Sequence, residues 1–326
     1  GRWHYRIGSG RRWASDHGAA SGKLSGTDPF VTEPVAAIDL GSNTFKLTIA
    51  SVVDGSVTLL VARAEHVRIS EGLQSSGRIR EEHMELAIAT IQTMCTEARS
   101  AGARSILVVG TAALRMASNT SVLIDRVRLA TGLDIDVISS EREARLTTAG
   151  ALSQLDSAGD LIVADIGGAS TELIHTRDGA ILQWTSLPIG SGLLTDQFRT
   201  QDPPIATEIA QMQHVVRQQA AMFLANVPPN CGMVLLEGVG RFLERIVGQQ
   251  GPLHLPVLET ALKASTEQTA EALAPRIATT AERARVVPAA FAIAHTIGYL
   301  LQPNRILIAR GGLNIGLLLE AAHQAA

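Results

Sequence analysis

The expected fold is decided by the stretch Val35-Ala36-Ala37-Ile38-Asp39-Leu40-Gly41-Ser42-Asn43-Thr44, because its pattern recurs later in the chain. In the second copy an apolar run, 161–164, leads into Asp165-Ile166-Gly167-Gly168-Ala169-Ser170-Thr171. Each motif is followed by an apolar run, an Asp-Gly pair (54–55 or 178–179) and another apolar run. An Asp-Gly pair between apolar runs is a strong hairpin signal. Each copy therefore predicts a strand, an Asp-x-Gly turn and a two-stranded hairpin.

Two copies of one β-rich unit, about one domain length apart, indicate a duplicated α/β fold. The first copy is followed by an expected helix over 81–100, a strand over 105–109 and a helix over 112–119. We expect two similar domains, at 35–145 and 146–326, that face each other across a central cleft. The last helix is able to pack back on the first domain. A repeated Asp-x-Gly hairpin in this arrangement resembles the superfamily of actin, Hsp70 and sugar kinases, whose two actin-like domains are ribonuclease H-like.

The composition argues against some classes of protein. The 326 residues include 28 basic and 31 acidic side chains, and a net charge of −3 gives no general attraction to nucleic acid or to an anionic membrane. The two cysteines make neither a disulfide framework nor a metal-ligand cluster. The longest apolar stretch, 286–301, is interrupted by Pro288 and His295 and is expected to be too short to span a membrane. A cytoplasmic protein is expected, with 1–34 as a disordered basic extension.

The two Asp-x-Gly turns carry residue types that hold phosphate and a divalent cation. Glycine lets the backbone approach an anion closely, since no Cβ intervenes. The candidate phosphate-binding residues of the turns are Gly41, Ser42, Asn43, Thr44, Gly167, Gly168, Ser170 and Thr171. The candidate ligands of Mg²⁺ (or Mn²⁺), bound directly or through water, are Asp39, Asp165 and Glu172. The alternative is that these are turn residues, present because Asp and Gly make tight turns.

Two further segments allow both a structural and a functional interpretation. Thr111 stands where an expected strand meets a helix start, and free N–H groups there, with Arg115, can bind an anion. Alternatively Thr111 is a plain N-cap and Arg115 a solvated helix residue. The segment 140–143 fits a capping box with Ser140 at the N-cap and Glu143 at the third helical position. Alternatively Glu143 is a general base that orients a water for attack on a terminal phosphate.

Taken together, the motifs resemble the Ppx/GppA phosphatase family of exopolyphosphatases and guanosine pentaphosphate phosphohydrolases, over roughly residues 35–326. The matching segments are Ala37 to Thr44, Gly110-Thr111 with Leu114-Arg115 and Asn119, Glu143 to Leu146, Asp165 to Gly168, and Ser170 to Leu173. The Ser-Asn-Thr after the first Asp-x-Gly and the Ser-Thr-Glu after the second separate this family from sugar kinases and actins.

The resemblance implies a role for each matching residue. Glu143 matches the family's general base, which acts on the attacking water. Asp165 and Glu172 match acidic residues needed for Mg²⁺ and for placing that water, so the three form the implied catalytic set. Arg115 matches an arginine that contacts the phosphate chain, and the turn residues match two phosphate loops. The family also suggests a homodimer.

The chain departs from the family pattern at several positions. Ser140 and Arg142 replace a glycine and a glutamate, and Ala169 replaces the last of three glycines. Arg241, with Glu237, stands in a loop that usually carries small residues, and Asn314 lies where the family usually has an arginine and a glutamate. These departures leave altered specificity or weakened activity open.

The expected activity is Mg-dependent hydrolysis of the terminal phosphoanhydride of inorganic polyphosphate or of guanosine pentaphosphate, by direct attack of water. One rival is an ATP-dependent kinase or ATPase on the same fold. A second rival is a catalytically weak sensor that binds polyphosphate or guanosine polyphosphate. The sequence does not decide between the two substrates, and it leaves chain-length preference, metal identity and oligomeric state open.

Overall fold

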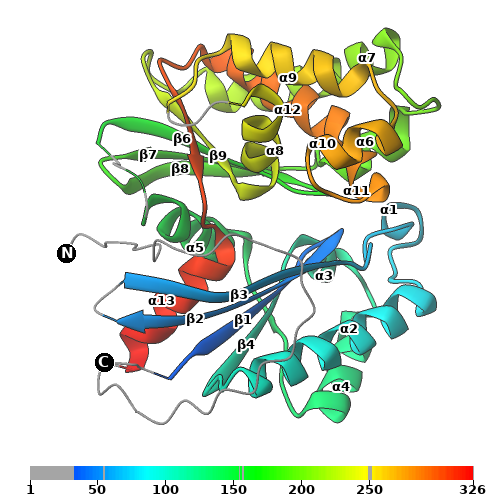
Figure 1. Cartoon of the computed structure of the whole chain (residues 1–326), viewed down its shortest axis with the longest axis vertical. Coiled ribbons are helices and arrows are strands. Elements are labelled where there is room, and N and C mark those ends of the chain that lie inside the picture. Colours follow the sequence, from blue (N-terminus) through cyan, green and yellow to red (C-terminus); the bar gives the residue numbers. More distant parts are fainter. Residues whose placement is uncertain (1–32, 54–55, 154, 156–157, 249–251, 326) are drawn as a thin grey trace.

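The computed structural model describes residues 33–53, 56–153, 155, 158–248 and 252–325, which form two α/β domains placed one above the other (Figure 1). The extension expected over 1–34 therefore lies, apart from its last two residues, outside the described residues. Each domain is built on a five-stranded mixed sheet. The prediction of a two-domain α/β fold is confirmed.

The sheet of domain I has the order β3-β2-β1-β4-β5. Its strands are β1 (Val35–Leu40), β2 (Thr44–Val53), β3 (Ser56–His66), β4 (Ser105–Gly110) and β5 (Asp136–Val137). β1, β2 and β3 form an antiparallel meander, and β4 and β5 extend it in parallel from β1. All six residues of β1 are buried, as expected for a central strand covered on both faces.

Domain II repeats this sheet with the order β10-β9-β6-β7-β8. Its strands are β6 (Asp160–Ile166), β7 (Thr171–Arg177), β8 (Ala180–Leu187), β9 (Gly232–Leu236) and β10 (Ile306–Ala309). β6, β7 and β8 are antiparallel, whereas β9 and β10 run parallel to β6. β6 is thus the counterpart of β1, and the predicted repeat of strand, turn and hairpin is confirmed.

The second hairpin turn has the backbone expected of an Asp-Gly pair. Asp178 and Gly179 both have positive φ, 51° and 82°, as a type I′ turn between twisted antiparallel strands requires. The first pair, 54–55, lies outside the described residues, although β2 and β3 on either side of it are paired.

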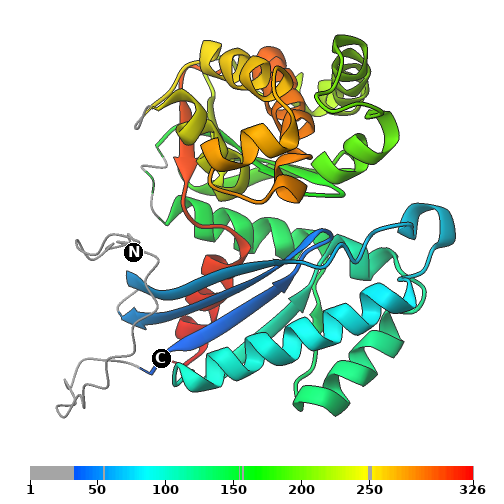
Figure 2. The same cartoon turned by 45° about the vertical axis from the view of Figure 1, so that its right-hand side comes forward.

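The helices cover the two sheets in layers (Figures 1 and 2). In domain I, α2 (Glu81–Ser100) and α4 (Thr120–Thr131) bury an aliphatic core against one face of the sheet. In domain II the corresponding layer contains α6 (Ser191–Phe198), α7 (Ala206–Leu224), α8 (Glu237–Val247), α9 (Pro256–Thr266), α10 (Ala270–Arg276), α11 (Ala281–Ala284) and α12 (Val287–Leu301). The short helices α1 (Leu73–Ser76) and α3 (Ala112–Met116) lie in loops of domain I.

Two helices lie between the sheets. α5 (Ser140–Leu152) packs against the inner face of the domain II sheet, and α13 (Leu313–Ala325) packs on β1 and β2 of domain I. They cross in contact through glycines: a Cβ built on Gly316 would lie 2.0 Å from the carbonyl oxygen of Leu146, and one on Gly150 equally close to that of Gly312. Only glycine permits this approach of two backbones.

Two local expectations were wrong. The helix expected over 112–119 ends at Met116, and a new helix starts at Thr120. Asn119 lies between them because its side-chain amide accepts from the backbone N–H of Ile79 and donates to the carbonyl of the same residue. The N-cap of α5 is Ser139, whose hydroxyl accepts from the N–H of Arg142, so the cap expected at Ser140 lies one residue earlier.

The apolar stretch near the end of domain II is a core helix. Residues 281–301 are long and apolar enough to cross a membrane by length and composition, so the expectation that this stretch is too short was wrong on length. In the fold, 72% of its most apolar window is buried, and α12 packs against α7 and α9.

Candidate functional site

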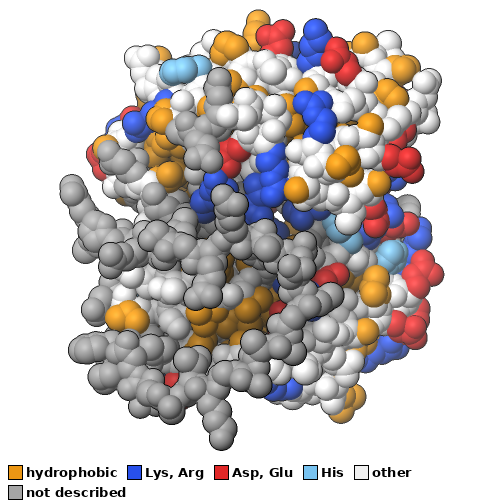
Figure 3. Space-filling view, in the orientation of Figure 1, with side chains coloured by type: hydrophobic (Ala, Val, Ile, Leu, Met, Phe, Trp, Pro, Cys, Tyr) orange, Lys and Arg blue, Asp and Glu red, His pale blue; other side chains and the backbone are white. Residues whose placement is uncertain are grey.

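A cleft of about 1000 Å³ lies between the two domains, and both Asp-x-Gly loops open into it. Figure 3 shows basic side chains gathered on its domain II side. Of the predicted site residues, the structure brings together in the cleft lining Asp39, Gly41, Ser42, Asn43, Thr44, Thr111, Glu143, Asp165, Gly167, Gly168, Ser170 and Glu172. Residues separated by more than a hundred positions thus line the same cleft.

The two loops touch each other at the floor of the cleft. A Cβ on Gly168 would lie 2.7 Å from the side chain of Asn43, so the domain I loop packs directly on the domain II loop. Gly190 and Gly192, at the start of α6, pack behind Gly168 at similarly short range. The segment 190–192 therefore serves mainly as support for the second loop, although Ser191 also lines the cleft.

The two aspartates occupy equivalent places on the two sheets but have different cross-strand partners. Asp39 on β1 pairs in register with Lys46 on β2, whose Nζ lies 3.9 Å from Oδ2 of Asp39. Asp165 on β6 pairs in register with Glu172 on β7. Domain I thus supplies a carboxylate with a cation, whereas domain II supplies two carboxylates. The difference places an excess of negative charge in this part of the cleft.

Four carboxyl groups of the cleft, of which Asp39, Glu143 and Glu172 are buried and Asp165 is partly buried, hold their protons more tightly than usual. Burial raises the pKa of Asp39 to about 6 against the opposing effect of Lys46, and burial likewise raises the pKa of Asp165. Burial raises the pKa of Glu143 to about 7, with Arg115 opposing and both aspartates adding to the rise. Burial, with the nearby charges of Glu143 and Asp165, raises the pKa of Glu172 to about 8. This group of carboxyls therefore favours a species that supplies positive charge.

Glu143 lies in the first turn of α5, where the helix N-terminus also favours negative charge. The residue is 8% exposed, and its Oε2 accepts a 2.7 Å hydrogen bond from Nη1 of Arg115. The same Arg115 nitrogen donates to the carbonyl of Ile138 at 3.0 Å. The guanidinium thereby fixes the carboxylate against α3 and the strand end before α5. A carboxylate held in this way, with a pKa near neutrality, has the properties of a general base.

Two residues that were predicted to bind phosphate, Arg115 and Thr171, do not line the cleft. Arg115 is outside the cleft lining, because its guanidinium is directed at Glu143 and not at the two loops. Thr171 is fully buried in β7, and its hydroxyl donates to the carbonyl of Ile189. Thr111 does line the cleft, but its hydroxyl faces the carbonyl of Leu40 at 3.5 Å. Arg115 is therefore placed to position Glu143, and Thr171 to hold the end of β8.

An unpaired carboxylate oxygen in the cleft is suited to bind a divalent cation. Oδ1 of Asp39 is buried and has no hydrogen-bond partner, and its neighbours are carboxyl groups with raised pKa values. Among the described residues, however, no three His, Cys, Asp or Glu side chains are grouped closely enough to hold a metal by themselves. Mg²⁺ usually takes only one or two carboxylates and completes its shell with water and substrate phosphate. Asp39, Asp165 and Glu172 suit that mode of binding.

Two of the sequence departures have clear structural partners. Arg142 lies on α5 away from the cleft lining and pairs with Asp136 and with Glu320 of α13, at 2.7 Å for the latter. Asn314 lines the cleft, and its amide donates to the carbonyl of Lys46 and to Thr48 Oγ1. Both residues thus fasten α13 to the rest of the molecule.

Several cleft residues were missed by sequence reasoning. They are Lys46, His66, Arg245, Arg283 and Arg310, together with Arg241, which was noted only as a departure. Lys46 could have been found, because it lies two residues after Thr44 on the same face of an expected strand. The arginines come from α8, α11 and the segment after β10, and no local pattern links those segments.

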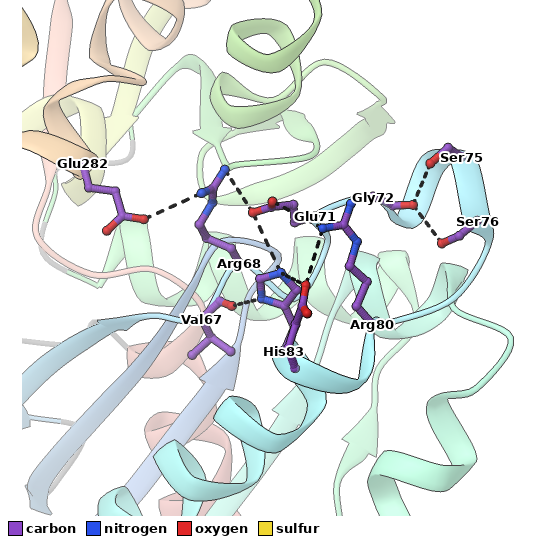
Figure 4. A network of polar contacts seen from close by, with 10 residues as sticks. Val67, Arg68, Glu71, Gly72, Ser75, Ser76, Arg80, His83 and Glu282 are labelled. Atoms are coloured by element: carbon purple, nitrogen blue, oxygen red, sulfur yellow. Dashed lines mark hydrogen bonds and ion pairs between the residues drawn. The ribbon is translucent and has the colours of Figure 1, made fainter.

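A network of ion pairs crosses between the domains beside the cleft (Figure 4). Arg68, which follows β3, pairs with Glu71 at 3.1 Å and reaches Glu282 of α11 at 3.9 Å. Glu71 also faces Arg80 and His83. The Arg68–Glu282 contact links the two domains.

The paired sheets and the two loops that face one cleft define a two-domain protein of the actin-like class. The chain belongs to the Ppx/GppA phosphatase family, whose sequence profile matches residues 48–325. Relatives named guanosine-5'-triphosphate,3'-diphosphate pyrophosphatase include one from Vibrio atlanticus, 29% identical over 291 residues, or 87% of this chain. One from Photobacterium profundum is 36% identical over 155 residues, covering 48% of this chain and 31% of the relative. The Vibrio atlanticus match spans 58% of that relative's length.

Solved structures support the same fold. A crystal structure of an exopolyphosphatase from Cytophaga hutchinsonii matches with a TM-score of 0.81 and 25% identity, over 89% of this chain and 98% of that one. The Aquifex aeolicus member of the Ppx/GppA family matches with a TM-score of 0.75 and 24% identity, over 90% and 98% of the two chains.

Proposed function

We propose that this protein hydrolyses the terminal phosphoanhydride of inorganic polyphosphate or of guanosine pentaphosphate, in a Mg²⁺-dependent reaction. The observation that carries the proposal is the position of Glu143. This buried carboxylate has a pKa of about 7, is held by a hydrogen bond from Arg115, and lines the cleft into which both Asp-x-Gly loops open. The names of the relatives point to the same bond type.

In the proposed reaction, water attacks the terminal phosphorus, and Glu143 accepts the proton that the water loses. The bond to the bridging oxygen breaks, and the shortened phosphate chain leaves with that oxygen. Loop N–H groups at 41–44 and 167–170 would hold the phosphate oxygens, since both segments line the cleft. Mg²⁺ held by Asp39, Asp165 and Glu172, directly or through water, would offset phosphate charge when bound.

The test measures phosphate release by the purified protein with Mg²⁺ from tripolyphosphate, long polyphosphate, guanosine pentaphosphate and ATP. Each substrate is also given to the Glu143→Gln variant and to a matched control, Glu141→Gln, because Glu141 is exposed two residues earlier on the same helix. We expect release from polyphosphate or guanosine pentaphosphate that falls by about 100-fold or more in Glu143→Gln and is unchanged in the control.

Other outcomes identify the rivals. Transfer of phosphate from ATP to an acceptor, with release of ADP, would identify a kinase. Tight binding of the polyphosphates without release would identify a sensor. Equal turnover by the Glu143→Gln variant would remove Glu143 from the proposed role.

A further inference from the structure

The segment that follows β3 in domain I lies against the first Asp-x-Gly loop. The backbone N–H groups of Val67 and Arg68 both donate to the carbonyl of Asn43, at 3.1 and 3.0 Å. The N–H of Ser70 donates to the carbonyl of Ser42, also at 3.1 Å. The backbone of this segment therefore holds two successive carbonyls of the loop in place.

Apolar side chains anchor the segment in domain I and leave Arg68 at the surface. Val67 and Ile69 are 1% and 0% exposed, in the aliphatic core that α2 also enters. Nδ1 of His83, on α2, donates to the carbonyl of Val67 at 3.0 Å. Arg68 lies between the two anchors with a φ of 52°, a backbone conformation that residues other than glycine adopt at a cost. The chain is thus held firmly at the residue whose side chain leaves the domain.

The guanidinium of Arg68 is shared between the two domains. Its Nη2 lies 3.1 Å from Oε2 of Glu71 in domain I, and its Nη1 lies 3.9 Å from Oε1 of Glu282 on α11 of domain II (Figure 4). Glu71 also faces Arg80 at 3.6 Å, within domain I. Arg68 therefore contacts the phosphate-type loop through its backbone and the opposite domain through its side chain.

The contact between Arg68 and Glu282 adjoins the cleft. Neither residue belongs to the described cleft lining, but His66 and Arg283, close to them in sequence, both do. His66 pairs in register with Thr44 at the end of the first loop. Burial lowers the pKa of His66, and the charges of Arg68 and Glu282 also act on it. The domain contact therefore lies at the edge of the cleft, beside the first loop.

We propose that Arg68 is a positioning residue, which couples the first Asp-x-Gly loop to domain II through its ion pair with Glu282. The pair holds the loop at 41–44 toward its counterpart at 167–170, on which Asn43 packs directly. A ligand whose phosphates contact both loops needs them at one spacing, and its affinity falls with the fraction of molecules that keep this spacing. The inference rests on the proposed function, which places the phosphates of the ligand at the two loops.

A direct effect of charge on ligand binding makes a different prediction. The ligand is a polyanion, so loss of a cation near the cleft should weaken its binding, whereas loss of an anion should strengthen it. In the proposed coupling Arg68 and Glu282 act as a pair, and the loss of either one weakens binding. The sign of the effect of a substitution at Glu282 therefore distinguishes the two explanations.

The experiment is a double-mutant cycle on the affinities for tripolyphosphate and guanosine pentaphosphate, measured by calorimetry in EDTA so that no turnover is needed. The variants are Arg68→Asn, Glu282→Gln, the double variant and the charge-retaining Arg68→Lys. Asparagine is chosen because it tolerates positive φ, which preserves the backbone hydrogen bonds to the loop. The matched control is Arg80→Gln, since the ion-pair partners of Arg80, Glu71 and Glu82, both belong to domain I.

We expect Arg68→Asn and Glu282→Gln each to weaken the binding of both ligands by about two- to fivefold, the range that exposed ion pairs provide. The double variant should bind no more weakly than either single variant, because both substitutions remove the same contact. Arg68→Lys should retain most of the affinity, and Arg80→Gln all of it.

Tighter or unchanged binding in Glu282→Gln would overturn the proposal. So would losses that add in the double variant, or a wild type that binds neither ligand. Unfolding temperatures identify any loss that comes from misfolding, and the exposed position of Glu282 keeps the test valid if Arg68→Asn does not fold.

The outcome is separable from that of the hydrolysis proposal. Coupling between Arg68 and Glu282 without phosphate release from any substrate would defeat the hydrolysis proposal and leave this one standing. Phosphate release together with wild-type affinity in Glu282→Gln would do the reverse.

Discussion

Arg115 and Glu143, one on α3 and the other on α5, are joined by a 2.7 Å hydrogen bond on the domain I side of the cleft. The sequence suggested that Arg115 would contact the phosphate chain, but the structure directs it at the proposed base. Its effect on a reaction should therefore appear in the ionisation and orientation of Glu143, and less in the affinity for substrate.

The first prediction concerns Arg115→Ala. Since Arg115 lowers the pKa of Glu143, its removal should raise that pKa further above about 7. A general base works only when deprotonated, so the acid limb of the kcat/KM profile should move to higher pH, with kcat lower by about 10- to 100-fold. The measurement is a pH–rate profile beside that of Arg145→Ala, which changes an exposed arginine of α5. An acid limb at the wild-type position would contradict this role for Arg115.

The second prediction concerns stability and pH. Asp39, Glu143 and Glu172 have folded-state pKa values of about 6, 7 and 8, above their ordinary values of 3.8 and 4.5. The folded protein therefore binds more protons than the unfolded chain over this range, and its stability should fall as pH rises from about 5 to above 8.

The measurement is the unfolding temperature in EDTA at pH 6 and pH 8.5, repeated with Mg²⁺. A loss of about 1 kcal/mol corresponds to roughly 2–4 °C in a protein of this size. Mg²⁺ should reduce the difference, because a cation stabilises the ionised carboxylates, and Glu172→Gln should reduce it as well. An unfolding temperature that rises with pH in EDTA would contradict the raised pKa values of these carboxyl groups in the folded protein.

The third prediction concerns the crossing of α5 and α13. In Gly316→Ala the new methyl group would meet the carbonyl of Leu146 at 2.0 Å, so the two helices must separate. We expect a loss of about 1–3 kcal/mol or more in the free energy of unfolding, as is usual for overpacking. The control is Gly238→Ala in α8, where a Cβ would meet nothing within 4 Å and stability should not fall. Chemical denaturation measures both, and equal stability of the two variants would contradict close helix contact.

The fourth prediction concerns Thr171→Val, which retains shape but removes the hydroxyl. The carbonyl of Ile189 would lose its donor in a buried position, at a cost of about 1–3 kcal/mol. Ligand affinity measured by calorimetry should stay within about twofold of wild type. Ser170→Ala, at the neighbouring cleft position, should show the opposite pattern. A large loss of affinity in Thr171→Val would restore the phosphate-binding role that the sequence suggested.

The duplicated fold could be predicted because its signals are local. The Asp-Gly turn at 178–179 and the apolar runs beside it determine a hairpin without help from the rest of the chain. The acidic part of the site was predictable for the same reason, since Asp39 and Asp165 are the last residues but one of equivalent strands. The break of the helix near Asn119 was not, because it depends on a contact with Ile79 that is forty residues away in sequence.

The arginines that line the cleft, Arg241, Arg245, Arg283 and Arg310, could not be predicted as part of the site because only tertiary packing brings them together. Arg283 and Arg310 belong to segments whose own patterns resemble ordinary solvated helix and strand ends. The orientation of the Arg115 side chain could not be predicted from the sequence either, because a helical arginine near a loop can face the solvent, a ligand or a carboxylate. Local patterns identify such residues as candidates, and the packing of the chain decides which group each one meets.

The position of α13 has a consequence for how the chain acquires its structure during synthesis. Val35 and Ala37 of β1 are buried beneath leucines of α13, including Leu317 and Leu318, which the ribosome produces almost three hundred residues later. One apolar face of the domain I sheet therefore stays without the cover of α13 while domain II is being synthesised. Apolar surface exposed in this way during synthesis is the kind that chaperones cover, and the core of domain I is completed only after domain II has been made.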